Sequence, residues 1–240
     1  MSSPLLSLVI PAYNEESRLP ATLRSVSDAL EAYGEPYEVL VVVNGSTDRT
    51  ADVVKAAAKR DSNIKLIVTP LAGKGRAVKI GITESSGDRI VFADADLSTP
   101  IEEVVALADR LNHKYQVVIA SREGHGAHRY SEPYTRHLMG RVFNLVVRML
   151  AVPGIQDTQC GFKAFSRECA RDVFRRQRID GFGFDVELLF LARQRGYGIL
   201  EVPVTWVYSD NTRVDKVRDT IRMFRDVLRV RLNAIRGTYR

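Results

Sequence analysis

Short apolar segments alternate with amphipathic segments along the first half of the chain. Five apolar runs have the length of β-strands, at Leu6–Ile10, Tyr37–Val43, Ile64–Val68, Arg89–Ala93 and Gln116–Ala120. Helical patterns lie between them, at Ser17–Tyr33, Asp48–Arg60, Gly75–Ser86 and Pro100–His113. This alternation predicts an α/β fold with a mostly parallel sheet flanked by helices.

The pattern changes after residue 120. Arg122–Tyr134 is rich in glycine, histidine and charge and predicts a mobile loop, whereas Arg136–Leu150 predicts a helix with a broad apolar surface. Two further strands are expected at Gly161–Phe165 and Ile199–Val204, with two helices between them. An apolar repeat of helical spacing ends the chain, at Val214, Val217, Ile221, Phe224, Leu228 and Ile235. This repeat either packs on the sheet or faces another partner.

The excess positive charge is concentrated at the end of the chain. Residues 213–240 contain nine Lys or Arg against three acidic residues, which equals the net charge of +6 for all 240 residues. Such a basic segment favours an anionic partner, either a nucleic acid or a membrane surface. No apolar run approaches the roughly 20 residues that span a bilayer. The choice between these two kinds of partner stays open at this point.

Two carboxylates follow the predicted strand Arg89–Ala93. Asp94 and Asp96 lie where open α/β sheets bind ligands. Alternate residues that leave a strand can turn both carboxylates toward one Mg²⁺ or Mn²⁺, and such a cation keeps positions available for phosphate oxygens. The alternative is that the pair only caps the following helix.

Basic residues in two regions are candidates for binding phosphate. Gly73–Arg76 opens a helix and offers backbone N–H groups together with Lys74, although a solvated turn is the alternative. A second group surrounds the predicted loop and consists of Arg122, Arg136, Arg141 and Arg213. Each of these arginines alone could be solvated or paired with an acid.

Three acidic residues in the second half of the chain have open roles. Asp157 could act as a base, contact a metal or cap a turn. Asp185 and Glu187 lie on different faces of one predicted helix, so at most one of them faces a cleft.

Several short strings, taken in order, resemble the inverting GT-A glycosyltransferases of family 2. They are Val9–Glu15, Val43–Asp48, Gly73–Gly75 and Phe92–Leu97. Three more strings are similar to the dolichyl- and polyprenyl-phosphate glycosyltransferases, especially the dolichyl-phosphate β-glucosyltransferase branch: Asp157–Lys163, Phe184–Leu189 and Glu201–Trp206. The resemblance covers nearly the whole chain. It implies one catalytic domain over residues 1–240 with a GT-A, Rossmann-like fold. It also implies a cytoplasmic protein that contacts a membrane peripherally, at the cytosolic face, to reach a lipid acceptor.

The resemblance also implies that different segments of that domain bind the donor and the acceptor. Residues 1–120 would bind a nucleotide sugar, residues 121–212 would bind the acceptor, and residues 213–240 would form a basic amphipathic helix. The implied donor-binding residues are Pro11, Tyr13, Glu15, Asn44, Lys74 and Asp94, with Asp94 and Asp96 holding Mg²⁺ or Mn²⁺. The implied acceptor-phosphate residues are Arg122, Arg136 and Arg213, and the catalytic set is Asp94, Asp96, Arg122 and Arg136.

The expected reaction moves glucose or N-acetylglucosamine from a UDP-sugar to dolichyl or polyprenyl phosphate. Asn44 replaces an acidic residue common in the family, and an amide matches the mixed donors and acceptors of uracil better than the two donors of guanine. GDP-mannose with the same lipid, or a UDP-sugar with a soluble hydroxyl acceptor, is the enzymatic alternative. A nucleic-acid-binding protein is the non-enzymatic alternative, although no nucleic-acid partner is expected, because the sequence lacks an aromatic platform for stacking bases.

Overall fold

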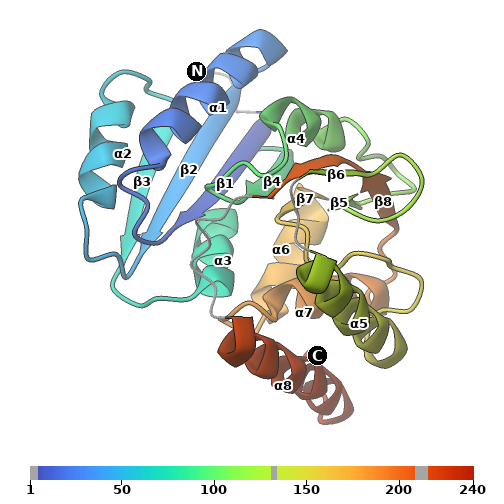
Figure 1. Cartoon of the computed structure of the whole chain (residues 1–240). Coiled ribbons are helices and arrows are strands. Elements are labelled where there is room, and N and C mark those ends of the chain that lie inside the picture. The colour runs from blue at the N-terminus through green and yellow to red at the C-terminus, as the bar shows by residue number, and fades with distance from the viewer. Residues whose placement is uncertain (1–4, 131–133, 209–215) are drawn as a thin grey trace.

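A seven-stranded sheet runs through the computed structural model of the chain, which describes residues 5–130, 134–208 and 216–240 (Figure 1). The strand order is β3-β2-β1-β4-β7-β5-β8, and every neighbouring pair is parallel except those that involve β7. The strands are β1 (Leu6–Ala12), β2 (Tyr37–Asn44), β3 (Ile64–Thr69), β4 (Arg89–Ala93), β5 (Val117–Ser121), β7 (Phe162–Ser166) and β8 (Ile199–Pro203). The mostly parallel α/β sheet predicted from the sequence is confirmed.

Two hydrophobic cores cover the two faces of the sheet. Strand β2 shows why both exist, because Val39, Val41 and Val43 enter one core while Leu40 and Val42 enter the other. Such alternation on an all-apolar strand is typical of a parallel sheet with helices on both faces. One face is covered by α1 (Leu19–Tyr33), α2 (Thr50–Ala58) and α4 (Ile101–Ala108). The other is covered by α3 (Lys74–Glu84), α5 (Tyr134–Leu150), α6 (Arg167–Arg176), α7 (Phe184–Gln194) and α8 (Lys216–Ile235).

The predicted loop Arg122–Tyr134 contains a short strand instead of being irregular throughout. Strand β6 (His128–Tyr130) pairs in parallel with β9 (Thr205–Val207) in a separate two-stranded sheet. Its three residues are too few to show alternation, and its partner lies more than 70 residues later in the chain. Local patterns therefore gave no signal for this pairing.

Helix α8 packs through a different stripe from the one that the sequence pattern singled out. Val227 and Val230 are fully buried in the core, whereas Ile221, Leu228 and Ile235 are 50%, 54% and 79% exposed. Of the predicted repeat, Phe224 is partly buried, with its ring 5.2 Å from that of Phe143. Of the two alternatives for this repeat, packing on the sheet is excluded for these three members, whereas Val214 lies outside the described residues. No helix in the described part of the chain is long and apolar enough to cross a membrane.

Candidate active site

A cleft of about 740 Å³ opens at the carboxyl ends of the central strands. Open α/β sheets bind ligands at this edge. Residues from both halves of the chain line it, including every residue implied to bind the donor: Pro11, Tyr13, Glu15, Asn44, Lys74 and Asp94. The structure therefore brings this set together, and its role toward a donor stays a prediction.

Asp94 and Asp96 lie directly after β4 and both line the cleft. Leu97 adopts a φ of 44°, a left-handed conformation that is costly for a branched residue and is often found at functional sites. Asp94 packs closely on the backbone of the neighbouring segment, because a Cβ added to Gly161 would lie 2.0 Å from Asp94 Oδ2. Only glycine leaves space there, so Gly161 helps to set the position of this carboxylate.

The two carboxylates suit a hard divalent cation. Their side chains are 31% and 29% exposed, so the oxygens are accessible from the cleft. No group of three or more His, Cys, Asp or Glu residues suited to a metal occurs among the described residues. Mg²⁺ is usually held by one or two carboxylates together with substrate phosphates and water, and this donor set fits that pattern.

Each of these carboxylates has a cation nearby. Lys74 Nζ lies 2.6 Å from Asp94 Oδ1, and Arg18 Nη1 lies 3.9 Å from Asp96 Oδ2. Burial lowers the pKa of Lys74, but the charges of Asp94 and Asp185 raise it by more, which keeps the amine protonated. Burial and then the charge of Asp94 raise the pKa of Asp96. Negative charge is therefore crowded at this point, a condition that a bound cation relieves.

Asn44 connects two of the loops that line the cleft. With its amide oriented to match its neighbours, the nitrogen donates to Ala12 O at 2.7 Å and the oxygen accepts from Gly73 N at 3.1 Å. An amide carries two hydrogens and two lone pairs, so one of each remains for a bound base. Asn44 thus also fixes the start of α3, a role that its sequence position did not reveal.

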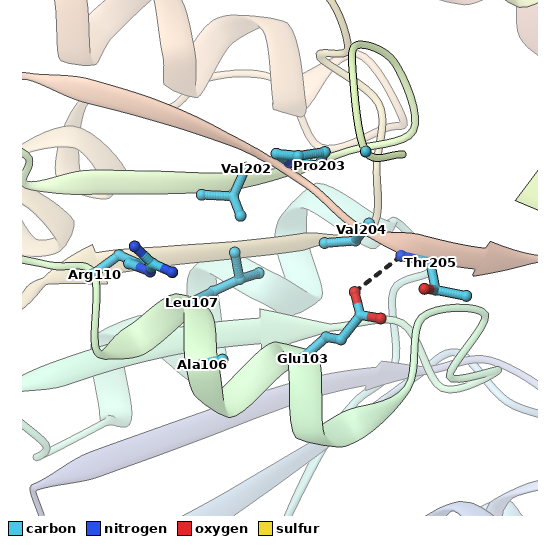
Figure 2. A pocket seen from close by; sticks show the side chains of 9 residues that line it. Glu103, Ala106, Leu107, Arg110, Val202, Pro203, Val204 and Thr205 are labelled. Atoms are coloured by element: carbon cyan, nitrogen blue, oxygen red, sulfur yellow. Dashed lines mark hydrogen bonds between the residues drawn. The ribbon is translucent and has the colours of Figure 1, made fainter. Parts of the chain in front are cut away.

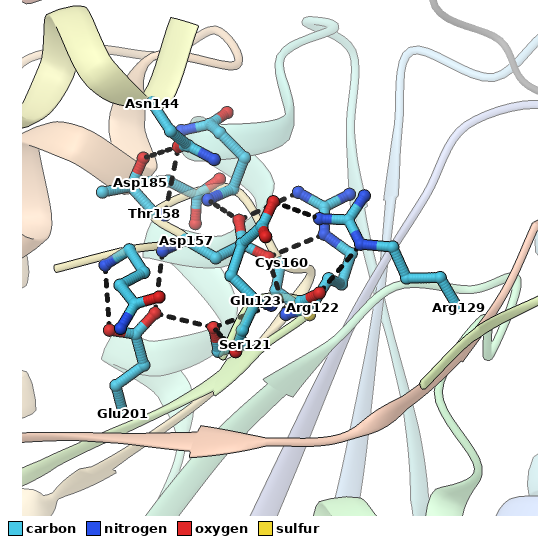
Figure 3. Close-up of polar contacts among 12 residues, drawn as sticks. Ser121, Arg122, Glu123, Arg129, Asn144, Asp157, Thr158, Cys160, Asp185 and Glu201 are labelled. Atoms are coloured by element: carbon cyan, nitrogen blue, oxygen red, sulfur yellow. Dashed lines mark hydrogen bonds and ion pairs between the residues drawn. The ribbon is translucent and has the colours of Figure 1, made fainter. Parts of the chain in front are cut away.

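Arg122 is held by Asp157 at the other end of the cleft (Figure 3). The Arg122 backbone N, Nε and Nη2 donate to the fully buried carboxylate at 2.9, 2.7 and 2.9 Å. Burial alone would raise the pKa of Asp157, but the Arg122 charge and these hydrogen bonds hold it well below its ordinary value. The guanidinium also lies 5.3 Å from the centre of the Trp206 ring. Asp157 is therefore suited to positioning Arg122 and poorly placed to act as a base.

The two acidic residues of α7 have separate tasks. Asp185 lines the cleft, and its Oδ1 lies 2.5 Å from Nζ of the fully buried Lys163. Glu187 is also buried, but it accepts hydrogen bonds from the backbone of Arg178 and Ile179 and from the Tyr239 hydroxyl. The prediction that at most one of the pair faces the cleft is confirmed.

The other predicted arginines are distributed differently. Arg141 is exposed on α5 and is absent from the described lining of the cleft. Arg136 belongs to α5 by its backbone, but its side chain lies outside the described part of the structure, and Arg213 lies wholly outside it. Their roles stay predictions.

Several cleft residues were not found by sequence reasoning. Arg18, Trp206 and three residues of α8, namely Arg222, Met223 and Asp226, line the cleft. Trp206 belongs to one of the strings that carry the resemblance, so that string was an available signal. The three α8 residues carried no sequence signal, because whether they line the cleft depends on how the terminal helix packs.

A smaller pocket of about 260 Å³ lies between α4 and β8–β9 (Figure 2). Aliphatic side chains such as Leu107 and Val202 dominate its lining, and Glu103 accepts a hydrogen bond from the backbone of Thr205 at 2.9 Å. None of the predicted site residues lines it, whereas the larger cleft contains all of the residues implied to bind the donor.

Comparisons with known proteins agree with this geometry. Residues 7–174 match the family described as glycosyl transferase family 2. Dolichyl-phosphate beta-glucosyltransferase of Homo sapiens is 36% identical over 98% of this chain and 77% of its own length. The enzyme of the same name from Dictyostelium discoideum is 34% identical over 98% of this chain and 76% of its length.

A solved structure shows the same fold. Glucosyl-3-phosphoglycerate synthase from Mycobacterium tuberculosis, in complex with UDP, superposes with a TM-score of 0.72 at 22% identity, over 95% of this chain and 80% of its own. Another structure of that protein contains Mn²⁺ together with UDP. The family match supports the enzymatic interpretation over the nucleic-acid-binding one. With its GT-A fold, its cleft at the strand ends, and relatives that match 98% of its length, the chain belongs to glycosyl transferase family 2.

Proposed function

We propose that this glycosyltransferase moves glucose from UDP-glucose to dolichyl or another polyprenyl phosphate, with inversion at the anomeric carbon. The observation that carries the proposal is the fixed arginine at the acceptor end of the cleft. Arg122 follows β5 and Asp94 follows β4, with β7 between these strands. Two strand spacings amount to about 10 Å, which leaves room for one sugar between two phosphate-binding groups.

The charges in the cleft support a metal-dependent donor. Among the described residues, its lining carries six carboxylates and four cations: Glu15, Asp94, Asp96, Asp180, Asp185 and Asp226, with Arg18, Lys74, Arg122 and Arg222. An anionic diphosphate placed beside Asp94 and Asp96 would be repelled by these two carboxylates unless a divalent cation accompanied it. Mg²⁺ or Mn²⁺ held by Asp94 and Asp96 would neutralise the charge that develops on the departing diphosphate. UDP and Mn²⁺ in the solved relative support the same donor chemistry.

The acceptor side needs no general base under this proposal. A lipid phosphate is already anionic near neutral pH, so its oxygen can attack without losing a proton. The task of the protein is then to align two anions, and Arg122 would hold the attacking phosphate behind the anomeric carbon. Asp157 engages two of the five N–H groups of that arginine and fixes its direction. Direct displacement would convert an α-linked donor to a β-linked product.

A panel of donors and acceptors tests the proposal. UDP-glucose, UDP-N-acetylglucosamine and GDP-mannose are each paired with a polyprenyl phosphate, the matching polyprenol and 3-phosphoglycerate, with Mg²⁺ or Mn²⁺ present. We expect glucose transfer from UDP-glucose to the polyprenyl phosphate, with a β-linkage detected by NMR. Transfer to the polyprenol or to 3-phosphoglycerate, with none to the polyprenyl phosphate, would overturn the assignment of the acceptor.

A further inference from the structure

Helix α8 carries two apolar stripes on nearly opposite sides. One stripe contains Met223, Val227, Val230 and Ala234 and packs in the core of the protein. The other, named here the outer stripe, contains Ile221, Leu228, Leu232 and Ile235, which are 50%, 54%, 48% and 79% exposed. At 3.6 residues per turn, the centres of the two stripes lie about 140° apart around the helix. The outer stripe therefore faces away from the core.

Exposed arginines border the outer stripe on both sides. Arg225, Arg229 and Arg236 lie on one flank and Arg231 lies on the other. Each flank is about 70° around the helix from the centre of the stripe. The single acidic residue between 221 and 240, Asp226, instead lines the cleft. An apolar stripe between two basic flanks is the arrangement of helices that lie in the plane of an anionic bilayer surface.

Helix α5 extends the apolar surface beside α8. The two helices lie next to each other at one end of the molecule, and the rings of Phe143 and Phe224 join them (Figure 1). Leu145 and Met149 of α5 are 47% and 68% exposed. Large exposed apolar areas on soluble domains mark contacts with proteins or membranes, and the basic flanks select an anionic lipid surface here.

We infer that α8 lies on an anionic lipid bilayer, with the outer stripe inserted among the acyl chains and the flanking arginines on lipid phosphates. Arg222 and Met223 of the same helix line the cleft, so the cleft opens beside the docked surface. A lipid phosphate could then enter the cleft while its chain stays in the bilayer. This access route rests on the proposed function, whereas docking itself is a separate property of the helix.

Vesicle sedimentation tests docking without reference to catalysis. Sucrose-loaded vesicles of phosphatidylcholine, with or without about one third phosphatidylglycerol, are mixed with the full chain at about 0.15 M salt. We expect binding to the anionic vesicles. Leu228→Ser/Leu232→Ser should weaken binding at least about tenfold, or about 1.4 kcal/mol. Arg225→Gln/Arg229→Gln should remove most of the preference for phosphatidylglycerol.

A matched control replaces apolar residues of similar exposure elsewhere. Val68 and Leu71 are 61% and 57% exposed near the β3 edge of the sheet, so Val68→Ser/Leu71→Ser should bind vesicles like the parent protein. Should the double leucine variant fold poorly by circular dichroism, Ile235→Ser, at the most exposed position of the stripe, replaces it.

Three results would overturn the inference: no binding of the parent protein to anionic vesicles, undiminished binding of the leucine variant, or a parent dimer that becomes a monomer when the leucines are replaced. The last result, from light scattering, would mean that a second copy covers the stripe. Transfer to a detergent-dispersed polyprenyl phosphate is measured in parallel. If the protein binds anionic vesicles but transfers no sugar to this acceptor, the result counts against the proposed function and leaves the docking inference intact.

Discussion

The pairing of Arg122 with Asp157 makes a strong prediction for Asp157→Asn. Asp157 Oδ2 accepts from the backbone N and Nε of Arg122, and Oδ1 accepts from Arg122 Nη2 and from Gln159 N at 3.1 Å. Whichever way an asparagine amide turns at this position, its NH₂ group faces two N–H donors. The substitution therefore removes the partner charge and opposes donor to donor within a fully buried site.

The expected loss of stability follows from burial. Breaking a buried ion pair by changing one partner costs about 3–5 kcal/mol. The Arg122 side chain is 15% exposed, so water can partly solvate the orphaned cation and the lower end, about 3 kcal/mol, is expected. For a chain of this size, that corresponds to a melting temperature lower by about 6–12 °C. The acceptor KM should also rise, because Arg122 loses its fixed direction.

Urea unfolding at pH 7 measures the free-energy change. Asp88→Asn is a suitable control, because Asp88 pairs with Arg167 at 3.1 Å while both side chains are largely exposed, and it should cost less than about 0.5 kcal/mol. Arg122→Met and the double variant complete a thermodynamic cycle. A loss below about 1 kcal/mol for Asp157→Asn, or a double variant that loses the simple sum of the two single losses, would refute the reasoning.

Three further outcomes are expected. Asp96→Asn should abolish sugar transfer at saturating Mn²⁺, while its melting temperature stays within a few degrees of that of the parent protein. Normal turnover of the parent protein in EDTA would contradict a metal role. Lys74→Met should weaken UDP binding about tenfold by calorimetry without a comparable change in acceptor KM. Burial raises the pKa of Glu38, but hydrogen bonds from Lys65 and Ser7 lower it to about 2 from the ordinary 4.5. Because the pKa of Glu38 is lower in the folded state, its carboxylate stabilises the fold by about 3 kcal/mol above about pH 4.5. This contribution is lost as the pH falls toward 2. The free energy of unfolding of Glu38→Gln should therefore fall less steeply with pH in that window than that of the parent protein.

Local sequence patterns predicted the elements whose signal lies within one segment. The strand at Tyr37–Val43 was placed within one residue of β2, because a strand buried on both faces is apolar throughout. The Asp94/Asp96 pair was found because the end of such a strand is itself a local signal. The sequence left open which side of α8 is buried, because both faces of that helix are apolar and only its tertiary contacts decide the question.

The pairings that sequence reasoning missed depend on contacts between distant segments. Asp157 contacts Arg122 across 35 positions, and Arg18, just before α1, lies 3.9 Å from Asp96 in the turn after β4. Neither pairing leaves a periodicity or a motif of its own. The single residue types were visible in each case, but their partners were set by the packing of the loops at the sheet edge.

The antiparallel strand β7 has a consequence for the order in which the chain folds. Strand β7 lies between β4 and β5 in the sheet, although it follows both of them in the sequence. Strand β5 can therefore join the sheet only after β7 has been synthesised. During translation, β5 therefore emerges from the ribosome before the strand that links it to β4 exists. A fragment ending at residue 120 would present β4 with a bare edge on the β7 side, which favours aggregation. The segments before and after residue 120 are in this sense one cooperative folding unit, and neither is expected to form a stable module by itself.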